Sequence, residues 1–352
     1  MSKFLLYGSY GYTGQLIVDL ATREGLRPIL AGRDEKQLRA QAGQYDLEYR
    51  AFSLDESAKL DRALLEVDAV LHCAGPFVHT YRAMAEACLR TRRHYVDISG
   101  EIPGFEALAA MNAQALEAGI LLLPGAGFDI VPSDCLAAHL KDRLPSATHF
   151  RLFVRGIGAG VSRGTAKSAI ENMHRQGMIR RDGKLVQVPP AWNVREQDFG
   201  RGPVPVVSIG WGDVSTAYHS TGIPNIETYF AFPKPYIRFL KAMRVIGPLL
   251  YNRPAKNLLK FFVDTLTPPG PKEERRRKGS AIFIGEVTDE QGGRALSKLV
   301  SPEGYTCTAL TTVEIMKRIL NGETKPGFQT PSLAYGANFI LQFDGVKRED
   351  LA

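Results

Sequence analysis

Three glycines near the start of the chain have a spacing that can bind phosphate groups. They directly follow the apolar run 4–7, and apolar residues recur at helical spacing after them. A strand, a glycine turn and a helix in this order place a pyrophosphate at the helix N-terminus, where free N–H groups and the helix dipole meet negative charge. The spacing is G-x-x-G-x-x-G, not the commoner G-x-G-x-x-G, and a tight turn without a ligand is the alternative. We predict that the whole segment binds a dinucleotide: Gly8, Ser9, Tyr10, Gly11, Tyr12, Thr13 and Gly14.

An arginine follows the second expected strand, residues 27–31. Arg33 lies nineteen positions after Gly14, where an acidic residue would bind the ribose 2′-hydroxyl of NAD and an arginine can bind the 2′-phosphate of NADP. Its guanidinium would pair with the phosphate and stack on adenine, although a solvated surface arginine is the alternative. Asp34 could cap the next helix or face the ribose. We expect NADP as the cofactor.

Three further motifs stand where expected strands end. The strand 69–72 leads into a Gly-Pro turn, the strand 94–98 into Ser-Gly-Glu, and the strand 120–123 into a glycine turn and an Asp. Open α/β sheets bind ligands at the carboxyl ends of their strands. We therefore expect these residues to complete the cofactor site: Cys73, Ala74, Gly75, Pro76, Phe77, Ser99 and Gly100.

The same strand ends supply candidate proton donors. Hydride transfer is the cofactor's chemistry, so the protein must orient the nicotinamide and provide a proton. Asp97 alternates with apolar residues and could be an inward-facing acid with a shifted pKa, or a structural carboxylate bonded to the glycine turns. Asp129 and Ser133 could act on substrate or cap a helix. The candidate catalytic residues are Tyr95, Asp97, Asp129 and Ser133. His174 and His219 are further possible acids.

These motifs require elements that alternate regularly. Expected strands and helices alternate through the first 143 residues, which predicts an α/β fold: a Rossmann-type, doubly wound parallel sheet. With 352 residues two domains are expected. We predict the NADP-binding Rossmann domain over 1–146 and an α+β substrate or dimerisation domain with a mainly antiparallel sheet over 147–324. A segment 325–352, with a last helix over 331–343, is expected to return to the Rossmann domain.

Composition excludes several classes of protein. The net charge of +7 lies in one segment, because residues 233–279 hold twelve Lys and Arg and three Asp and Glu. The chain is therefore not expected to bind nucleic acid. Its four cysteines form no C-x-x-C pair, and no metal-spaced cluster, Ser-His-Asp set or Tyr-x-x-x-Lys pair is visible in the sequence. Residues 1–3 lead directly into the first strand, so we expect no signal peptide and a cytoplasmic protein.

The basic segment contains an amphipathic pattern over residues 235–266. Four basic residues share one helical arc, opposite four apolar ones: Lys234, Arg238, Lys241 and Arg244 against Phe239, Leu240, Met243 and Ile246. A second apolar set lies beside Lys256 and Lys260 and consists of Leu258, Leu259, Phe261 and Phe262. Such helices can lie on an anionic membrane surface. The alternative is a buried or subunit-interface helix pair. We expect a homodimer and peripheral membrane contact through 235–266.

Five blocks in order resemble the saccharopine dehydrogenase-like oxidoreductases: residues 8–14, 31–33, 73–77, 95–101 and 127–134. The closer branch resembles trans-acting enoyl reductases and animal saccharopine dehydrogenase-like proteins. The resemblance implies an NADP-binding Rossmann domain, a second α+β domain and oxidoreductase activity.

Three hypotheses about function remain open. The first is NADPH-dependent reduction of a C=C bond in an apolar or lipid-linked substrate. The second is reductive C–N chemistry on an amino acid, which would need an arginine cluster, with Arg163, Arg180 and Arg181 as possible members. The third is a membrane-associated protein that binds NADP without turnover.

Overall fold

The computed structural model of the chain describes residues 3–158, 160–172, 177–250 and 253–352. The chain forms two compact units, each built from two stretches. Unit 1 comprises Met1–Val131 and Tyr305–Ala334, and unit 2 comprises Pro132–Gly304 and Tyr335–Ala352. This division differs from the predicted boundaries after residues 146 and 324. The difference arises because two segments from late in the chain belong to unit 1: the helix over residues 304–320 and the strand over residues 327–328, which pairs within the first sheet.

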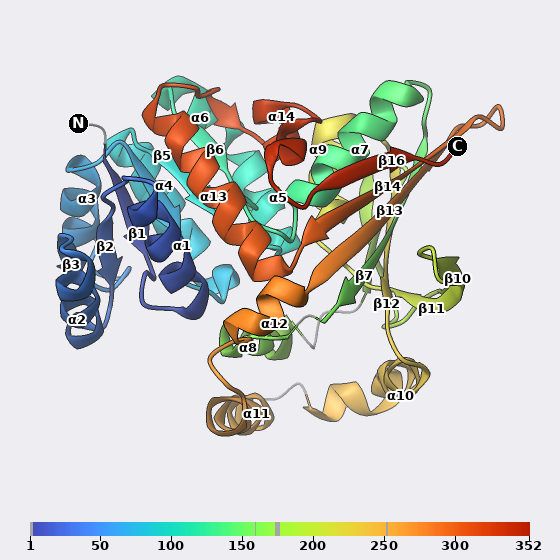
Figure 1. The fold of residues 1–352 in the computed structure, drawn as a ribbon, viewed down its shortest axis with the longest axis horizontal. Coiled ribbons are helices and arrows are strands. Elements are labelled where there is room, and N and C mark those ends of the chain that lie inside the picture. Colours follow the sequence, from blue (N-terminus) through green and yellow to red (C-terminus); the bar gives the residue numbers. More distant parts are fainter. Residues whose placement is uncertain (1–2, 159, 173–176, 251–252) are drawn as a thin grey trace. The chain divides into compact units, whose positions relative to one another are not determined.

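Unit 1 is built on a seven-stranded sheet in the order β15-β6-β5-β4-β1-β2-β3 (Figure 1), in which every pair is parallel. The expected doubly wound parallel sheet is therefore confirmed. The order reverses between β1 and β4, which makes the carboxyl ends of these strands the switch point where such sheets bind ligands. The strands are β1 (Phe4–Tyr7), β2 (Ile29–Gly32), β3 (Tyr49–Ala51), β4 (Ala69–His72), β5 (His94–Asp97), β6 (Leu121–Leu123) and β15 (Gly327–Phe328).

The strands are short and apolar because both faces of the sheet are covered. Alternate side chains such as Leu5, Val70 and Tyr95 pack in one cluster with side chains of α3, α4 and α5. Figure 1 also shows α13, orange-red and late in the chain, beside the blue elements of this unit, where Lys317 pairs with Glu24 of the α1 end. The helices are α1 (Tyr12–Arg23), α2 (Glu35–Tyr45), α3 (Ser57–Leu65), α4 (Tyr81–Thr91), α5 (Ile102–Ala110), α6 (Asn112–Ala118) and α13 (Gly304–Leu320), with a 3-10 turn η1 (Phe77–His79).

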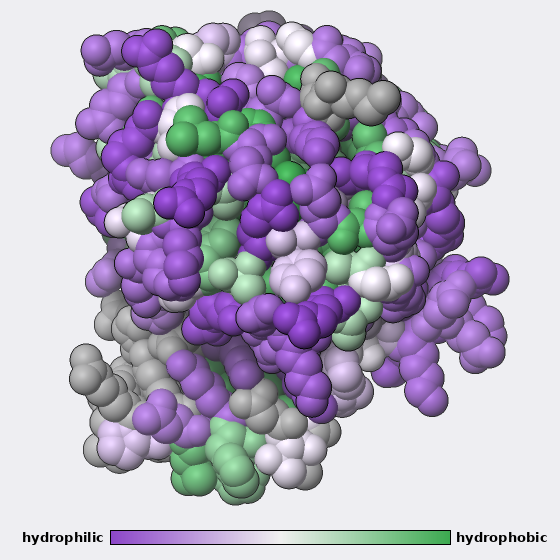
Figure 2. All heavy atoms as spheres, turned by 90° about the vertical axis from the view of Figure 1, so that its left-hand side faces the viewer, coloured by the Kyte–Doolittle hydropathy of each residue, from purple (hydrophilic) through white to green (hydrophobic). Residues whose placement is uncertain are grey.

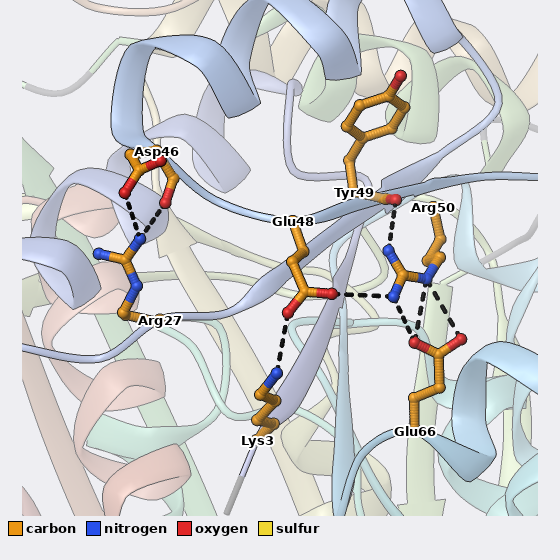
Figure 3. A network of polar contacts seen from close by, with 7 residues as sticks. All are labelled: Lys3, Arg27, Asp46, Glu48, Tyr49, Arg50 and Glu66. Carbon is orange, nitrogen blue, oxygen red and sulfur yellow. Dashed lines mark hydrogen bonds and ion pairs between the residues drawn. The ribbon is translucent and has the colours of Figure 1, made fainter. Parts of the chain in front are cut away.

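The amino ends of β1, β2 and β3 carry paired charges (Figure 3). Glu48 accepts hydrogen bonds from Lys3 at 2.9 Å and from Arg50 at 3.0 Å, and Arg50 also binds Glu66. Arg27 pairs with Asp46 at 2.9 Å. These side chains are largely exposed, so each pair contributes at most about 1 kcal/mol to stability. The amino edge thus balances its own charges and leaves the carboxyl edge as the place for a ligand.

Unit 2 is built on a nine-stranded sheet, whose main path is β10-β11-β12-β7-β13-β14-β16, with the hairpin β8–β9 attached to β12. Among the described strands, β7 and β12 pair in parallel and the other pairs are antiparallel, as expected. The strands are β7 (His149–Ile157), β8 (Gly177–Arg181), β9 (Lys184–Val188), β10 (Val194–Asp198), β11 (Pro203–Ser208), β12 (Asn225–Ala231), β13 (Ser280–Thr288), β14 (Arg294–Pro302) and β16 (Lys347–Asp350).

The helices of unit 2 include one that the sequence did not reveal. The helix α9 (Asp213–Thr221) lies within residues 147–324, where a mainly antiparallel sheet was expected. It is short and largely buried, with glycine at both caps and several Ser and Thr residues, which are not typical of a helix interior. The others are α7 (Val131–Arg143), α8 (Arg163–Asn172), α10 (Lys234–Leu250), α11 (Arg253–Leu266), α12 (Glu273–Lys278) and α14 (Pro331–Tyr335), of which α7 and α14 cross the unit boundary.

The predicted last helix over 331–343 is wrong as a single element. It is divided into α14 and a 3-10 turn η2 (Phe339–Gln342). Gly336 lies between them at φ +87°, a left-handed conformation that stops a helix. In the predicted C-terminal segment, β15 pairs with β6 in unit 1, whereas β16 pairs with β14 in unit 2.

Candidate functional site

Close backbone approach explains the glycines of the first loop. Gly8 follows β1 at φ +85°, and a Cβ added there would lie 2.9 Å from the backbone N of Ala74 in the loop after β4. A Cβ on Gly14 would lie 2.4 Å from the carbonyl O of Gly8. Neither position can hold a side chain without moving the backbone. The turn between β1 and α1 therefore lies directly against the loop after β4, at the switch point of the sheet.

The start of α1 has the features of an anion site. Gly11 is its N-cap, no side chain caps the helix, and its first turn carries no acidic residue. The positive end of the helix dipole therefore has neither a side-chain cap nor an acidic residue in the first turn to compensate it. This arrangement fits the pyrophosphate of a dinucleotide. Tyr12 and Thr13, in the same turn, are half-buried, and the Tyr12 ring meets Tyr305 of α13 edge-on at 5.0 Å.

Tyr10 connects this loop to the end of β2. Its hydroxyl accepts hydrogen bonds from the backbone N of Arg33 at 3.1 Å and of Asp34 at 3.2 Å. Its ring lies so close to Gly32 that a Cβ there would be 2.5 Å from Tyr10 Cε1. Arg33 is thereby held beside the glycine loop, with an exposed side chain that forms no ion pair with a described residue. Gly32 was not among the predicted site residues, although a glycine at a strand end is a usable signal for close contact.

Asp34 caps a helix, which was one of its two predicted roles. Its Oδ1 accepts a hydrogen bond from the backbone N of Gln37 at 3.1 Å, and its Oδ2 accepts one from the Gln37 side chain at 2.7 Å. These bonds hold the pKa of the Asp34 carboxyl below its usual value. The carboxylate is therefore engaged at the start of α2.

Ser9 faces the protein interior. Its hydroxyl donates to Oε1 of Gln41 at 2.8 Å, and the Gln41 amide donates to the carbonyl of Ser9 at 3.0 Å. Both residues are buried. Ser9 thus fixes the loop to α2, and its hydroxyl is directed away from the anion site. Gln41 was not predicted from the sequence, because nothing in its helix marks it as a partner of a loop 32 positions earlier.

The loop after β4 is held by a carboxylate from the loop after β5. The Glu101 carboxylate accepts hydrogen bonds from the backbone N of Phe77 at 3.1 Å and of Val78 at 2.8 Å, at the start of η1. Cys73 begins the loop and donates its backbone N–H to Tyr7 O at 2.8 Å. Burial, and to a lesser extent Asp97, raises the pKa of the Cys73 thiol, which therefore stays protonated. Ala74 and Pro76 are half-buried and Gly75 is exposed.

Asp97 is a buried carboxylate with every oxygen engaged. Its Oδ1 accepts hydrogen bonds from the backbone N of Ser99 at 2.8 Å and of Gly125 at 2.9 Å, and its Oδ2 accepts one from the Tyr95 hydroxyl at 2.6 Å. Burial raises its pKa to about 6, although these three bonds act in the opposite direction. Of its two predicted roles, this geometry fits the structural carboxylate. Tyr95 is fully buried and is the partner of this carboxylate.

Asp129 is the acid of the edge with a pKa near neutrality. It is half-buried, and its carboxylate lies so close to Gly100 that a Cβ there would be 2.8 Å from Oδ2. Burial, followed by the negative charge of Glu101, raises its pKa to about 7. A carboxyl with this pKa holds a proton in a large fraction of molecules at neutral pH and can donate it.

Threonines of α13 hold the loop that carries Asp129. The backbone N of Phe128 donates to Thr308 Oγ1 at 3.0 Å, and Thr311 Oγ1 donates to the carbonyl of Ala126 at 2.7 Å. A Cβ on Gly127 would be 2.9 Å from Thr308. These threonines were not among the residues predicted from the sequence. The available signal was the run of threonines in an otherwise apolar helix, because threonine is a poor helix former.

The remaining predicted residues are dispersed. Ser133 is fully buried on α7, and His219 is half-buried on α9. His174 lies outside the described residues. Arg180 is buried, donates to the carbonyls of Val214 at 2.8 Å and Gly183 at 2.7 Å, and stacks on the Tyr218 ring. Its guanidinium is therefore engaged within unit 2 and is a poor candidate for a substrate-carboxylate cluster.

A parallel sheet with a glycine loop and an uncapped helix at its switch point defines a Rossmann-type dinucleotide-binding domain. Residues 4–123 match the family model described as the saccharopine dehydrogenase NADP binding domain. The resemblance inferred from the sequence is thereby confirmed: residues 4–123 of unit 1 are similar to the NADP-binding domain of saccharopine dehydrogenase.

Similar proteins extend this match beyond the first domain. The chain is 26% identical to the "Lipid droplet localized protein" of Caenorhabditis elegans, over 58% of this chain and 57% of that one. It is 29% identical to the "Trans-acting enoyl reductase" of Mycobacterium ulcerans, over 40% and 36%. The chain thus spans about half the length of the curated relatives it matches. A solved structure, the saccharopine dehydrogenase (L-Glu forming) of Saccharomyces cerevisiae, aligns over the full length of both chains with a TM-score of 0.69 and 13% identity, which shows a shared fold.

Proposed function

We propose that this protein is an NADP(H)-dependent oxidoreductase. The observation that carries the proposal is the carboxyl edge of unit 1, where three features adjoin: an uncapped helix N-terminus, a glycine loop without room for side chains, and an arginine that forms no ion pair with a described residue. The match to an NADP-binding domain over residues 4–123 supports it independently.

The choice of NADP over NAD depends on Arg33 and Asp34. Arg33 offers an exposed cation beside the loop, suited to a 2′-phosphate. Asp34, the acidic residue that could bind a ribose 2′-hydroxyl, is engaged as a helix cap. Both features favour the phosphorylated cofactor.

The residues of the edge divide into those that hold the site and one that moves a proton. NADPH, when bound, supplies a hydride. Asp97 and Glu101 fix the turns after β4, β5 and β6 through bonds to backbone N–H groups. Asp129, with a pKa of about 7, is the proton donor that completes the reduction. Asp97 is a positioning residue, because both oxygens of its carboxylate already accept hydrogen bonds from the protein.

The substrate we propose is an apolar or lipid-linked molecule with a reducible C=C bond. The name of the Mycobacterium ulcerans relative and that of the Caenorhabditis elegans relative support an enoyl, lipid-related substrate. The engagement of Arg180 with two carbonyls weakens the alternative of an amino-acid substrate, because a substrate carboxylate would need a free guanidinium. The shared fold with saccharopine dehydrogenase keeps reductive C–N chemistry as the second candidate.

A cofactor titration tests the assignment of the binding site. The dissociation constants of NADPH and NADH are measured by protein fluorescence for the wild type, Arg33→Ala and Arg27→Ala. Arg27 is the matched control, since it precedes β2, whereas Arg33 follows it. Loss of a charge-assisted bond predicts NADPH binding about 10- to 100-fold weaker in Arg33→Ala, with NADH binding and the Arg27 variant little changed. Equal binding of NADH and NADPH by the wild type, unaltered by Arg33→Ala, would refute the NADP assignment.

Turnover separates the candidate reactions. NADPH oxidation is followed with a panel of enoyl thioesters of increasing chain length and a panel of oxo-acid and amine pairs. Oxidation with enoyl substrates supports the proposed reaction, and oxidation only with the second panel supports C–N chemistry. Tight NADPH binding without turnover on either panel favours the non-enzymatic alternative.

A further inference from the structure

The second unit exposes apolar side chains on helix α11. Leu258, Phe261 and Phe262 fall on one arc of the helix, and 57%, 63% and 48% of their surfaces are exposed. The opposite arc is the packed one, with Leu259 and Val263 half-buried and α11 contacting α8. Soluble domains bury the more aromatic face of an amphipathic helix. Here that face is the outer one.

Helix α10 repeats this arrangement. Ile237 packs against Ala191 and Val207, whereas Tyr236 and Phe239 are 44% and 49% exposed, with ring centroids 6.1 Å apart. Figure 2 shows an apolar area, in green, at the bottom of the view, and Figure 1 also draws α11 at the bottom. The side chains of Met243 and Ile246, which the sequence grouped with this face, lie outside the described residues.

Positive charges accompany the aromatic groups on α10. Lys234, Arg238 and Lys241 share the arc of this helix opposite Phe239, are exposed, and form no ion pair with a described residue. Arg244, predicted on the same arc, turns away and donates to the carbonyls of Pro190 and Ala191 at 2.8 and 2.7 Å. Over residues 234–266 the sequence holds seven Lys and Arg against one Asp.

We propose that α10 and α11 form a docking surface for an anionic phospholipid layer. Exposed aromatic and leucine side chains would enter the boundary between headgroups and acyl chains, and the flanking lysines and arginine would meet the lipid phosphates. No helix in the described part of the chain is long and apolar enough to cross a membrane, so the helices lie on the layer.

The positive charge of this surface disfavours binding of a second copy of the same chain. A symmetric dimer through this face would bring two surfaces of the same positive sign together, which opposes association. An anionic layer supplies the complementary sign. The proposal is independent of the reaction proposed above, and either can fail alone.

Vesicle flotation tests the surface directly. The full chain is mixed at physiological ionic strength with vesicles of phosphatidylcholine alone or with phosphatidylserine added. We expect binding to the vesicles that contain phosphatidylserine, weakening as salt is raised. Absence of binding by the wild type would overturn the proposal.

The charged arc is tested by Lys234→Gln/Arg238→Gln/Lys241→Gln. Each basic residue near an anionic surface strengthens binding about fivefold, so the triple variant should bind about 100-fold more weakly. The matched control removes the same charge from the exposed faces of α3 and α4 in unit 1, by Lys59→Gln/Arg62→Gln/Arg82→Gln. Equal losses in both variants would mean that net charge alone drives binding, and the proposed surface would be wrong.

The apolar arc is tested by Leu258→Ser/Phe261→Ser/Phe262→Ser. This variant should lose vesicle binding while its thermal midpoint and NADPH affinity stay at the wild-type values, which excludes misfolding as the cause. Sedimentation supplies the competing outcome. A wild-type dimer that this variant dissociates, without vesicle binding by the wild type, would assign the face to contact between copies.

Discussion

The carboxyl edge of the unit 1 sheet buries charged groups, whereas helices α10 and α11 of unit 2 expose aromatic ones. Asp97 is 1% exposed and Phe261 is 63% exposed, the reverse of their usual positions. Burying a charge and exposing an aromatic ring are both unfavourable, and the two regions differ in whether other groups of the chain offset that unfavourable free energy. The Asp97 carboxylate has three hydrogen-bond donors around it, but the outer face of α11 has no described side chain over it.

The two regions therefore differ in whether they need a partner from outside the chain. A buried carboxylate with satisfied oxygens is a finished part of the fold, because its partners stabilise it without a ligand. An exposed aromatic face contributes no burial free energy to folding, and its apolar surface is removed from water only when an external partner covers it. The first region therefore forms a site by positioning backbone groups, and the second forms a surface by leaving side chains uncovered.

The largest expected effect is on the turnover rate and distinguishes Asp129, the proposed proton donor, from Asp97, which positions backbone groups. If Asp129 donates the proton, Asp129→Asn should lower the turnover rate by about 10²- to 10⁴-fold, because the amide keeps the shape but cannot supply a proton. The wild-type rate should fall above pH 7 as Asp129 loses its proton, and that limb should vanish in the variant. Unchanged NADPH affinity is the control. A rate within tenfold of the wild type, with the same pH profile, would exclude this role.

Removal of the Asp97 side chain should destabilise the loops at the carboxyl edge of the sheet. Asp97→Ala leaves the Ser99 and Gly125 N–H groups and the Tyr95 hydroxyl without their acceptor, which should lower the free energy of unfolding by at least ~3 kcal/mol. Asp97→Asn keeps one acceptor oxygen and should cost less. Urea denaturation measures both. Similar, small losses in the two variants would show that the bonds contribute little.

The pH dependence of stability isolates the charge of Asp97. Its folded pKa of about 6 lies above the ordinary value of 3.8, so the folded protein holds this proton after the unfolded chain has released it. The resulting stability is present below pH 4 and is lost as the pH rises through 6. The advantage of the wild type over Asp97→Asn should therefore shrink by about 3 kcal/mol between pH 4 and pH 7. Denaturation curves whose difference is constant with pH would contradict the raised pKa.

The smallest expected effect concerns the exposed face. Phe261→Ala should change the free energy of unfolding by less than about 0.5 kcal/mol, since the ring makes little contact inside the chain. Phe105→Ala, at a fully buried position of α5, is the matched control and should cost about 3–5 kcal/mol. A loss above 1 kcal/mol from Phe261→Ala would show that α11 packs its aromatic face against the protein.

The sequence predicted the parallel sheet and most of its strands because apolar runs and glycine turns are local patterns. The apolar run 4–7, for example, coincides with strand β1. It did not predict α9 or the break at Gly336, where short buried elements lack a full period. The domain boundaries also could not be read from it, because the pairing of β15 with β6 joins segments about 200 positions apart.

The candidate site divides in the same way. The sequence located Gly8, Gly14 and Arg33 correctly around one turn, although their contact with a cofactor stays a prediction. It placed Tyr95 and Asp97 among possible catalytic groups, whereas the structure engages each with the other. It also missed Thr308 and Gln41, which position the loops from distant helices.

By itself, the sequence determined where the chain can turn tightly, which residue types follow each strand and where positive charge collects. These properties are set by single residues and their neighbours along the chain. Only the tertiary structure decided which carboxylates are satisfied, which acid has a pKa near 7 and which helix face is uncovered. Burial and hydrogen bonding depend on groups brought together from distant parts of the chain, and local sequence does not specify those neighbours.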